Sequence, residues 1–114
     1  MTPAAFDTAC RSLPAATMDV QWGEDHVYKV GGRMFAVTGP VGGGCSIKVS
    51  DIAFEALVEG GRARPAPYLA RAKWVRFDDL PAVDGAEMAD WLKTAHALVA
   101  AKLTRKQRAE LGLS

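Results

Sequence analysis

The strongest constraint in this sequence is one apolar stripe that recurs at helical spacing between residues 86 and 103. Charged side chains occupy other positions of the same segment, as expected of a helix with one face against a core. A helix of this length is about 27 Å long, enough to lie across a four- or five-stranded sheet. We therefore predict a long helix packed on a sheet, with Trp91 and Leu92 largely buried. The stripe consists of Met88, Trp91, Leu92, Ala95, Val99 and Leu103.

Segments earlier in the chain alternate between apolar and polar residues, which is typical of strands with one buried face. Residues 24–39 are predicted to form a hairpin, because Gly31 and Gly32 can adopt the positive φ angles of a tight turn between two β-rich runs. Residues 17–22 and 45–49 alternate in the same way. These patterns predict three or four antiparallel strands.

One more strand is predicted at residues 73–79. It follows a turn in which Pro65 cannot lie inside a sheet and a short helix that Pro67 can start. The alternation gives this strand a core side and a half-exposed side. The half-exposed side is expected to carry Trp74, Arg76 and Asp78.

Residues typical of helix N-termini predict three shorter helices. A threonine cap followed by proline opens one at residues 2–13, Ser50 caps another over residues 51–59, and Thr104 caps a last short one. The order of elements predicts an α+β fold, with an antiparallel sheet of four to five strands and helices packed on one face. The length is that of a single domain over residues 1–114.

Composition limits the partners and the compartment. The 114 residues carry a net charge of +1, which argues against a dedicated, high-affinity nucleic-acid binder. No apolar run approaches the roughly 18 residues needed to span a membrane, and the first residues do not resemble a secretory signal. We expect a cytoplasmic monomer that does not associate with membranes. Cys10 and Cys45 belong to no metal-binding spacing, and we expect them to be reduced thiols.

No catalytic constellation stands out, so we expect no enzyme activity, no cofactor and no metal. Gly39 and Gly44 have the spacing of a phosphate-binding loop, but Cys45 stands where that loop needs lysine. His26 and His96 are on different predicted elements and share no metal-ligand spacing. A turn of the G-x-S-x-G type is absent from the sequence.

The charge distribution offers one candidate binding surface. Residues 1–60 carry four basic and seven acidic residues, whereas residues 61–114 carry ten and six. Arginine side chains suit phosphate oxygens and an exposed aromatic ring can stack on a base, although the same residues could form only a solvated rim. Tyr68 lies within the basic segment. The candidate nucleic-acid contacts are Lys29, Lys48, Arg62, Arg64, Arg71, Lys73, Trp74 and Arg76.

Two segments together resemble the MmcQ/YjbR family of small bacterial proteins. The first is VQWGEDHVYKVGGRMFAV, from Val20 to Val37, and the second is RPAPYLARAKWVRF, from Arg64 to Phe77. This sequence differs from the family pattern at two places. Arg33 stands where lysine is common, and Ala72–Lys73 stands where a basic–His pair is often found.

The resemblance implies a compact α+β fold similar to secretion-chaperone-like domains. It also implies DNA binding through a double-winged motif, which is largely an inference from the fold. The positions that the resemblance would transfer as contacts are Lys29, Lys48, Lys73, Trp74 and Arg76.

Three functional hypotheses follow. The leading one is a non-catalytic protein that binds DNA weakly and largely without sequence specificity. The alternative is a protein- or peptide-binding module of chaperone-like fold, which would use the exposed face of the sheet or the groove beside the long helix. The third is a small-molecule pocket between sheet and helix.

Overall fold

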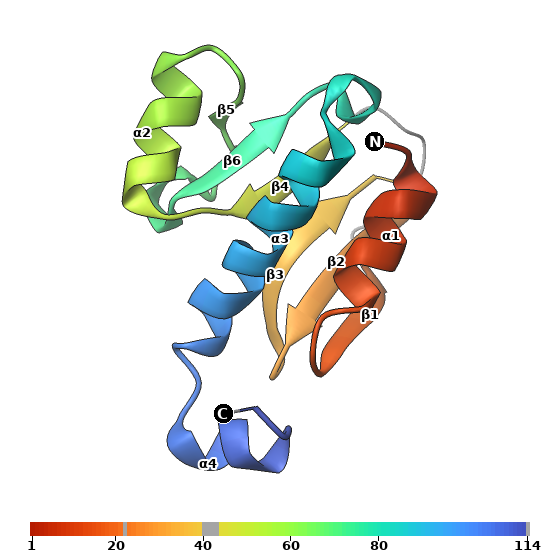
Figure 1. Ribbon diagram of the computed structural model, residues 1–114, viewed down its shortest axis with the longest axis vertical. Coiled ribbons are helices and arrows are strands. Elements are labelled where there is room, and N and C mark those ends of the chain that lie inside the picture. The colour runs from red at the N-terminus through yellow and green to blue at the C-terminus, as the bar shows by residue number, and fades with distance from the viewer. Residues whose placement is uncertain (22, 40–43, 114) are drawn as a thin grey trace.

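The predicted long helix is present and lies across a sheet. The computed structural model describes residues 1–21, 23–39 and 44–113. Figure 1 shows the helices α1 and α3 side by side on one face of an antiparallel sheet, whose strand order is β1-β2-β3-β4-β6-β5. The expected α+β class and the packing of these helices on one face are therefore confirmed.

In the described residues the sheet has six strands, where four to five were expected. The additional strand is β5, a two-residue strand that contains Pro65 and pairs only with β6. Proline is tolerated there because β5 lies at the edge of the sheet, where no further strand needs its missing N–H. The strands are β1 (Ala16–Gln21), β2 (Asp25–Val30), β3 (Arg33–Thr38), β4 (Cys45–Lys48), β5 (Arg64–Pro65) and β6 (Trp74–Phe77).

The helices begin where their capping residues predict. Thr2, Ser50 and Thr104 each accept a hydrogen bond from a backbone N–H of the first turn, and Asp84 does the same for the long helix. The α-helices are α1 (Pro3–Arg11), α2 (Asp51–Glu59), α3 (Gly85–Ala100) and α4 (Arg105–Glu110), and the 3₁₀ turns are η1 (Ala70–Ala72) and η2 (Leu80–Ala82).

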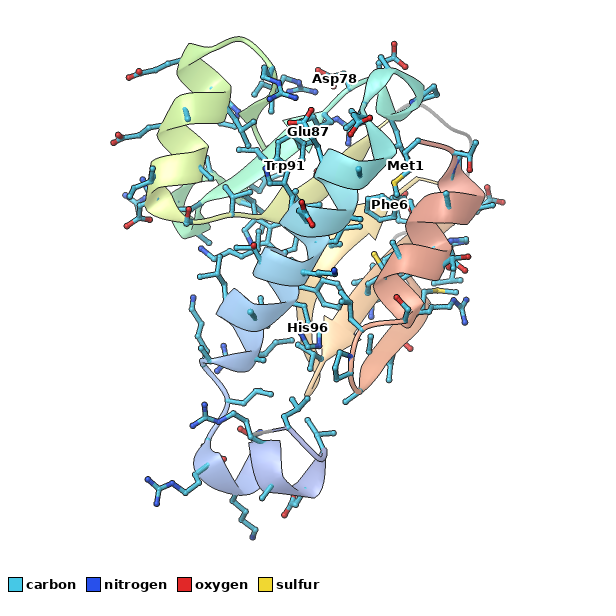
Figure 2. The ribbon with its side chains drawn as sticks, viewed as in Figure 1. Met1, Phe6, Asp78, Glu87, Trp91 and His96 are labelled. Carbon is cyan, nitrogen blue, oxygen red and sulfur yellow. The ribbon has the colours of Figure 1, made fainter. Side chains whose placement is uncertain are left out.

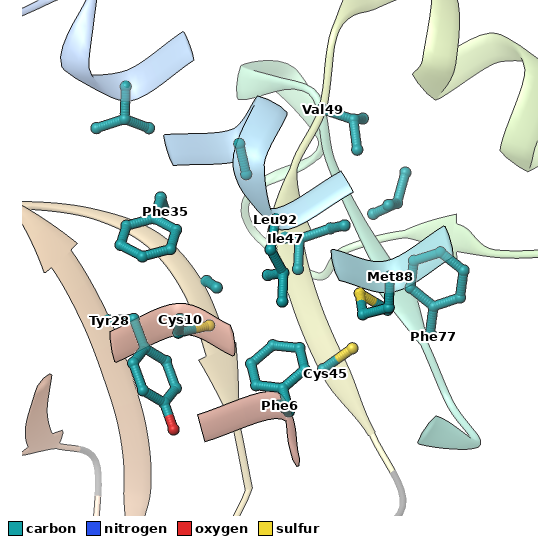
Figure 3. Packing of buried hydrophobic residues seen from close by; sticks show 14 of the residues in the cluster. Phe6, Cys10, Tyr28, Phe35, Cys45, Ile47, Val49, Phe77, Met88 and Leu92 are labelled. Atoms are coloured by element: carbon teal, nitrogen blue, oxygen red, sulfur yellow. The ribbon is translucent and has the colours of Figure 1, made fainter. Parts of the chain in front are cut away.

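The core lies between the sheet and the layer formed by α1 and α3. Leu92 and Met88 of α3 meet Ile47 of β4, and Phe6 of α1 fills the space beside them (Figure 3). All four of these side chains are fully buried. Burial of large apolar side chains is the main favourable term in folding, so the opposite face of the sheet is the one left for polar contacts.

Trp91 is less buried than the stripe predicted. Leu92 is fully buried, but Trp91 lies at the margin of the core, where its ring stacks on Phe77 at 5.2 Å between centroids and lies under the guanidinium of Arg62. Met88 and Leu92 face the centre of the core, whereas Trp91 faces its margin beside Phe77 and Arg62.

The β2–β3 hairpin has the predicted turn and one irregularity that the sequence did not predict. Gly31 and Gly32 have φ angles of 60° and 80°. The pairing register shifts within β2, which leaves Phe35 without a residue opposite it. This bulge places the Phe35 ring in the core, where it meets His96 edge-on at 5.4 Å between centroids.

Cys10 and Cys45 are both buried and do not form a disulfide with each other. Burial raises the pKa of both thiols, that of Cys45 to about 12, so neither is a reactive thiolate near neutral pH. Within residues 1–21, 23–39 and 44–113, no helix is long and apolar enough to cross a membrane, and no group of three or more His, Cys, Asp or Glu side chains could hold a metal ion.

The two turn glycines allow a matched stability test. A Cβ at Gly31 would lie 2.7 Å from the side chain of Leu103, whereas a Cβ at Gly32 would meet nothing within 4 Å. We expect Gly32→Ala to lower the free energy of unfolding by about 1–2 kcal/mol, the cost of a left-handed backbone for an L-residue. Gly31→Ala should cost more, because it adds the collision with Leu103. Urea unfolding curves would measure both. Equal losses would show that the Leu103 side chain moves aside. An excess that persists in a Leu103→Ala background would show that the collision is not its cause.

Trp91 and Leu92 are adjacent in α3 but should contribute differently to stability. Leu92→Ala should lower the free energy of unfolding by about 2–5 kcal/mol, because it leaves a cavity in the core. Trp91→Ala should cost less than the ~3–5 kcal/mol typical of a fully buried aromatic residue. Guanidinium unfolding followed by circular dichroism would compare the two. A larger loss for Trp91→Ala than for Leu92→Ala would contradict this ranking.

Candidate functional site

The eight candidate contacts predicted from the sequence differ in whether a carboxylate group lies beside them. Arg64 donates two hydrogen bonds to Asp78, from Nε at 2.8 Å and from Nη2 at 3.0 Å, and Arg76 Nε donates a third at 3.0 Å. Hydrogen bonding from Arg64, together with that from Arg76, lowers the pKa of Asp78. Both arginines are therefore already engaged by an ionised carboxylate.

Two more candidates have acidic partners as well. Arg62 Nη2 lies 2.9 Å from a carboxylate oxygen of Glu87, and Lys29 Nζ lies 3.2 Å from Asp19 on the neighbouring strand. Glu87, Asp78 and Trp91 are labelled near the same end of α3 in Figure 2. Exposed ion pairs contribute little to stability, but they offset the positive charge that a phosphate would need.

The hollow around these arginines is correspondingly acidic. It has a volume of about 660 Å³, and its lining contains three guanidinium groups but four carboxylates. An anion placed there would meet a net negative surface, so the arginine-rich part of the segment from Gly61 to Asp79 is a poor phosphate site. The charged residues of this lining are Arg62, Arg64, Arg76, Asp78, Asp79, Asp84 and Glu87.

The remaining basic candidates lie elsewhere, around η1. None of them forms an ion pair within the part of the chain that the structure describes. Two basic residues that were not among the candidates join them, one from the start of β3 and one just beyond the end of α3. We call this group the basic cluster: Arg33, Lys48, Arg71, Lys73 and Lys102.

Lys48 lies at the centre of the basic cluster. Its Nζ donates a hydrogen bond to the backbone carbonyl of Ala72 in η1. Burial lowers the pKa of Lys48, and the positive charges of Lys102 and Lys73 lower it further, while Asp51 acts in the opposite direction. Like charges therefore lie close together, and no carboxylate in the described part of the chain forms an ion pair with Lys48, Lys73 or Lys102. A bound anion would reduce their mutual repulsion.

Three residues of the cluster line a hollow of about 300 Å³ at the end of the sheet where β3 and β6 begin and where β4 and α3 end. Apolar side chains line it together with these three basic residues. We call it the basic hollow; it is lined by Arg33, Met34, Lys48, Leu69, Ala72, Trp74, Val99 and Lys102.

A second hollow adjoins the first and shares Met34 and Leu69 with it. It has a volume of about 500 Å³ and lies on the open face of the sheet. Tyr68 stands at its rim with a fully exposed ring and a φ of 66°, a conformation that is rare for a bulky residue. We call it the apolar groove; it is lined by Asp25, Met34, Val37, Ser46, Pro67, Tyr68, Leu69 and Arg76.

Trp74 is not on a half-exposed face, contrary to the prediction for its strand. Only 4% of its surface is exposed, because the segment between β5 and β6 folds back over it. Two backbone hydrogen bonds close this segment, from Ala66 N to the Trp74 carbonyl and from Trp74 N to the Leu69 carbonyl. The indole is therefore part of the floor of the basic hollow and is not available to stack on a base.

The short helix predicted from Pro67 is also absent. The left-handed conformation of Tyr68 prevents a helix from starting there, and only the 3₁₀ turn η1 forms. Lys73, also left-handed, ends this turn, and its Nζ lies 4.9 Å from the centroid of the Phe54 ring. Proline is compatible with the first position of a helix but does not require one, and here the tertiary contacts of the loop determine its conformation.

Sequence reasoning missed Arg33 and Lys102 as site residues. They are 69 positions apart and meet only because the β2–β3 turn lies beside the end of α3, where Leu103 packs against Gly31. One signal was available for Arg33, which occupies a position where the MmcQ/YjbR pattern commonly has lysine. Nothing in the local pattern distinguishes Lys102 from the other charged residues near it.

Comparisons with known proteins agree with this fold. The crystal structure of DR2400 from Deinococcus radiodurans, a protein with a DUF419 domain, is similar with a TM-score of 0.82 and 27% sequence identity, over 94% of this chain and 85% of that one. A search of curated proteins gave no match. The family model YjbR matches residues 11–98. This chain therefore belongs to the YjbR family.

Proposed function

We propose that this protein binds DNA weakly and with little sequence preference, without catalysing a reaction, through phosphate contacts made by the basic cluster. The observation that carries the proposal is the difference between two sets of basic side chains. Arg62, Arg64, Arg76 and Lys29 have acidic partners, whereas the five members of the basic cluster have none in the described residues. Cations without partners are the ones that release counterions from a nucleic acid on binding.

Weak affinity and low specificity follow from the same observations. The net charge of +1 provides little long-range attraction, so we expect micromolar or weaker binding at physiological salt. Contacts to phosphate carry no sequence information by themselves. Arg71 and Lys73 lie in and beside a 3₁₀ turn of three residues, which is too short to act as a recognition helix in a groove of duplex DNA.

A peptide-binding module is the second candidate, and the apolar groove favours it. Met34, Val37 and Pro67 line the groove, and the fully exposed Tyr68 ring could cover an apolar side chain of a partner. Exposed aromatic side chains with strained backbones are common at binding sites. Tests on the two hollows separate this reading from DNA binding.

A charge-matched pair of double variants tests the proposal. Arg71→Ala with Lys102→Ala should weaken binding to every DNA sequence about equally and reduce the slope of log affinity against log salt by about 0.9 for each phosphate that is no longer neutralised. Arg62→Ala with Arg64→Ala removes the same charge from acid-paired positions and should change the affinity much less. Fluorescence anisotropy with labelled duplexes at several salt concentrations would measure both. No binding by the parent protein at about 50 mM salt, or equal weakening by both variants, would contradict the proposal.

Tyr68 provides a second test, which concerns single strands. Tyr68→Asn removes the ring while keeping a residue that tolerates the left-handed conformation. We expect it to weaken the binding of single-stranded DNA more than that of duplex DNA, because base stacking contributes only where bases are unpaired. Tyr68→Phe keeps the ring and should bind as the parent does. If Tyr68→Asn leaves single-strand binding unchanged but abolishes capture of apolar peptides, the peptide reading replaces this one.

A further inference from the structure

We infer that the basic hollow is a binding site for a phosphate monoester. The inference deepens the proposed function, on which it rests for the nucleic-acid source of the ligand. Arg33 from the start of β3, Lys48 from the end of β4 and Lys102 from just beyond α3 all line it. Arginine and lysine heads arranged around one small space are the usual means of binding phosphate in proteins.

The charge of the hollow selects the kind of phosphate. Three cations stand around it, and none forms an ion pair in residues 1–21, 23–39 or 44–113. A phosphodiester brings one negative charge, whereas a phosphate monoester brings about −1.5 to −2 at neutral pH. The monoester therefore offsets more of the repulsion between Lys48 and Lys102.

The walls of the hollow strengthen this selection. Leu69, Trp74 and Val99 line it, and Trp74 and Val99 are almost completely buried. Apolar walls lower the local dielectric, so each charged contact is stronger than it would be on an open surface. The hydrogen bond from Lys48 Nζ to the Ala72 carbonyl restricts the ammonium group to this site.

The adjoining apolar groove indicates what is attached to the phosphate. Met34 and Leu69 belong to both hollows, so a ligand can place its phosphate in one and an apolar or aromatic body in the other. The Tyr68 ring at the rim offers a stacking surface for such a body. A single strand that ends in a phosphate has this shape, and so does a small phosphorylated molecule.

The experiment compares a short oligothymidine with and without a 5′-phosphate, each labelled at its 3′ end, by fluorescence anisotropy. We expect the phosphorylated strand to bind roughly tenfold more tightly, the effect of one charge-assisted hydrogen bond. Inorganic phosphate should displace the phosphorylated strand at concentrations where chloride of equal ionic strength does not. Ribose 5-phosphate, used as a competitor, reports whether the monoester is recognised without a base or a chain.

Matched lysine variants locate the effect. Lys48→Met keeps the aliphatic stem and should abolish the advantage of the 5′-phosphate, as should Lys102→Met. Lys29 does not line the hollow and is paired with Asp19, so Lys29→Met should retain the advantage. Because Lys102 can also interact favourably with the C-terminal end of α3, Lys48→Met is the decisive variant.

Each outcome separates this inference from the proposed function. If both oligonucleotides bind equally, or if Lys48→Met keeps the phosphate advantage, the monoester site is wrong while DNA binding stands. If ribose 5-phosphate and inorganic phosphate bind but neither oligonucleotide does, the monoester site stands and the DNA proposal fails.

Discussion

The packing of α3 across β3 and β4 is the interaction on which the remaining structure depends. It buries the inner face of the sheet, so the outer face and the exposed sides of the helices are left for contact with a partner. The same packing brings the end of α3 beside the turn at Gly31, and so places Lys102 near Arg33. The basic hollow therefore depends on the core, because packing in the core brings together the elements that carry its cations.

Acidic residues are as important to the candidate site as basic ones. The segment from Gly61 to Asp79 is rich in arginine, yet Asp78 and Glu87 engage three of its guanidinium groups. These ion pairs lie where α2, β6 and α3 approach one another, and they tie the loop after α2 to the rest of the fold. The basic residues of this loop that form no such ion pair, Arg71 and Lys73, lie at its other end, in and beside η1.

The loop between β5 and β6 determines that Trp74 is buried and Tyr68 is exposed. Its backbone closes over Trp74 through hydrogen bonds to Ala66 and Leu69, and this closure pushes Tyr68 outward in a left-handed conformation. Trp74 then supports the floor of the basic hollow, while Tyr68 is left at the rim of the apolar groove. Two hollows of different chemistry consequently meet along one short loop.

The sequence by itself determined the α+β class, the helix starts, the glycine turn and most of the strands, because these depend on local periodicity, caps and backbone freedom. It also identified Lys48, Arg71 and Lys73 as basic residues of a candidate surface. Tertiary structure alone decided which cations have acidic partners, whether Trp74 or Tyr68 is exposed, and that Arg33 and Lys102 meet Lys48. The physical reason is that pairing and burial depend on distances between elements far apart in the chain, and alternation along one strand cannot report what folds over it.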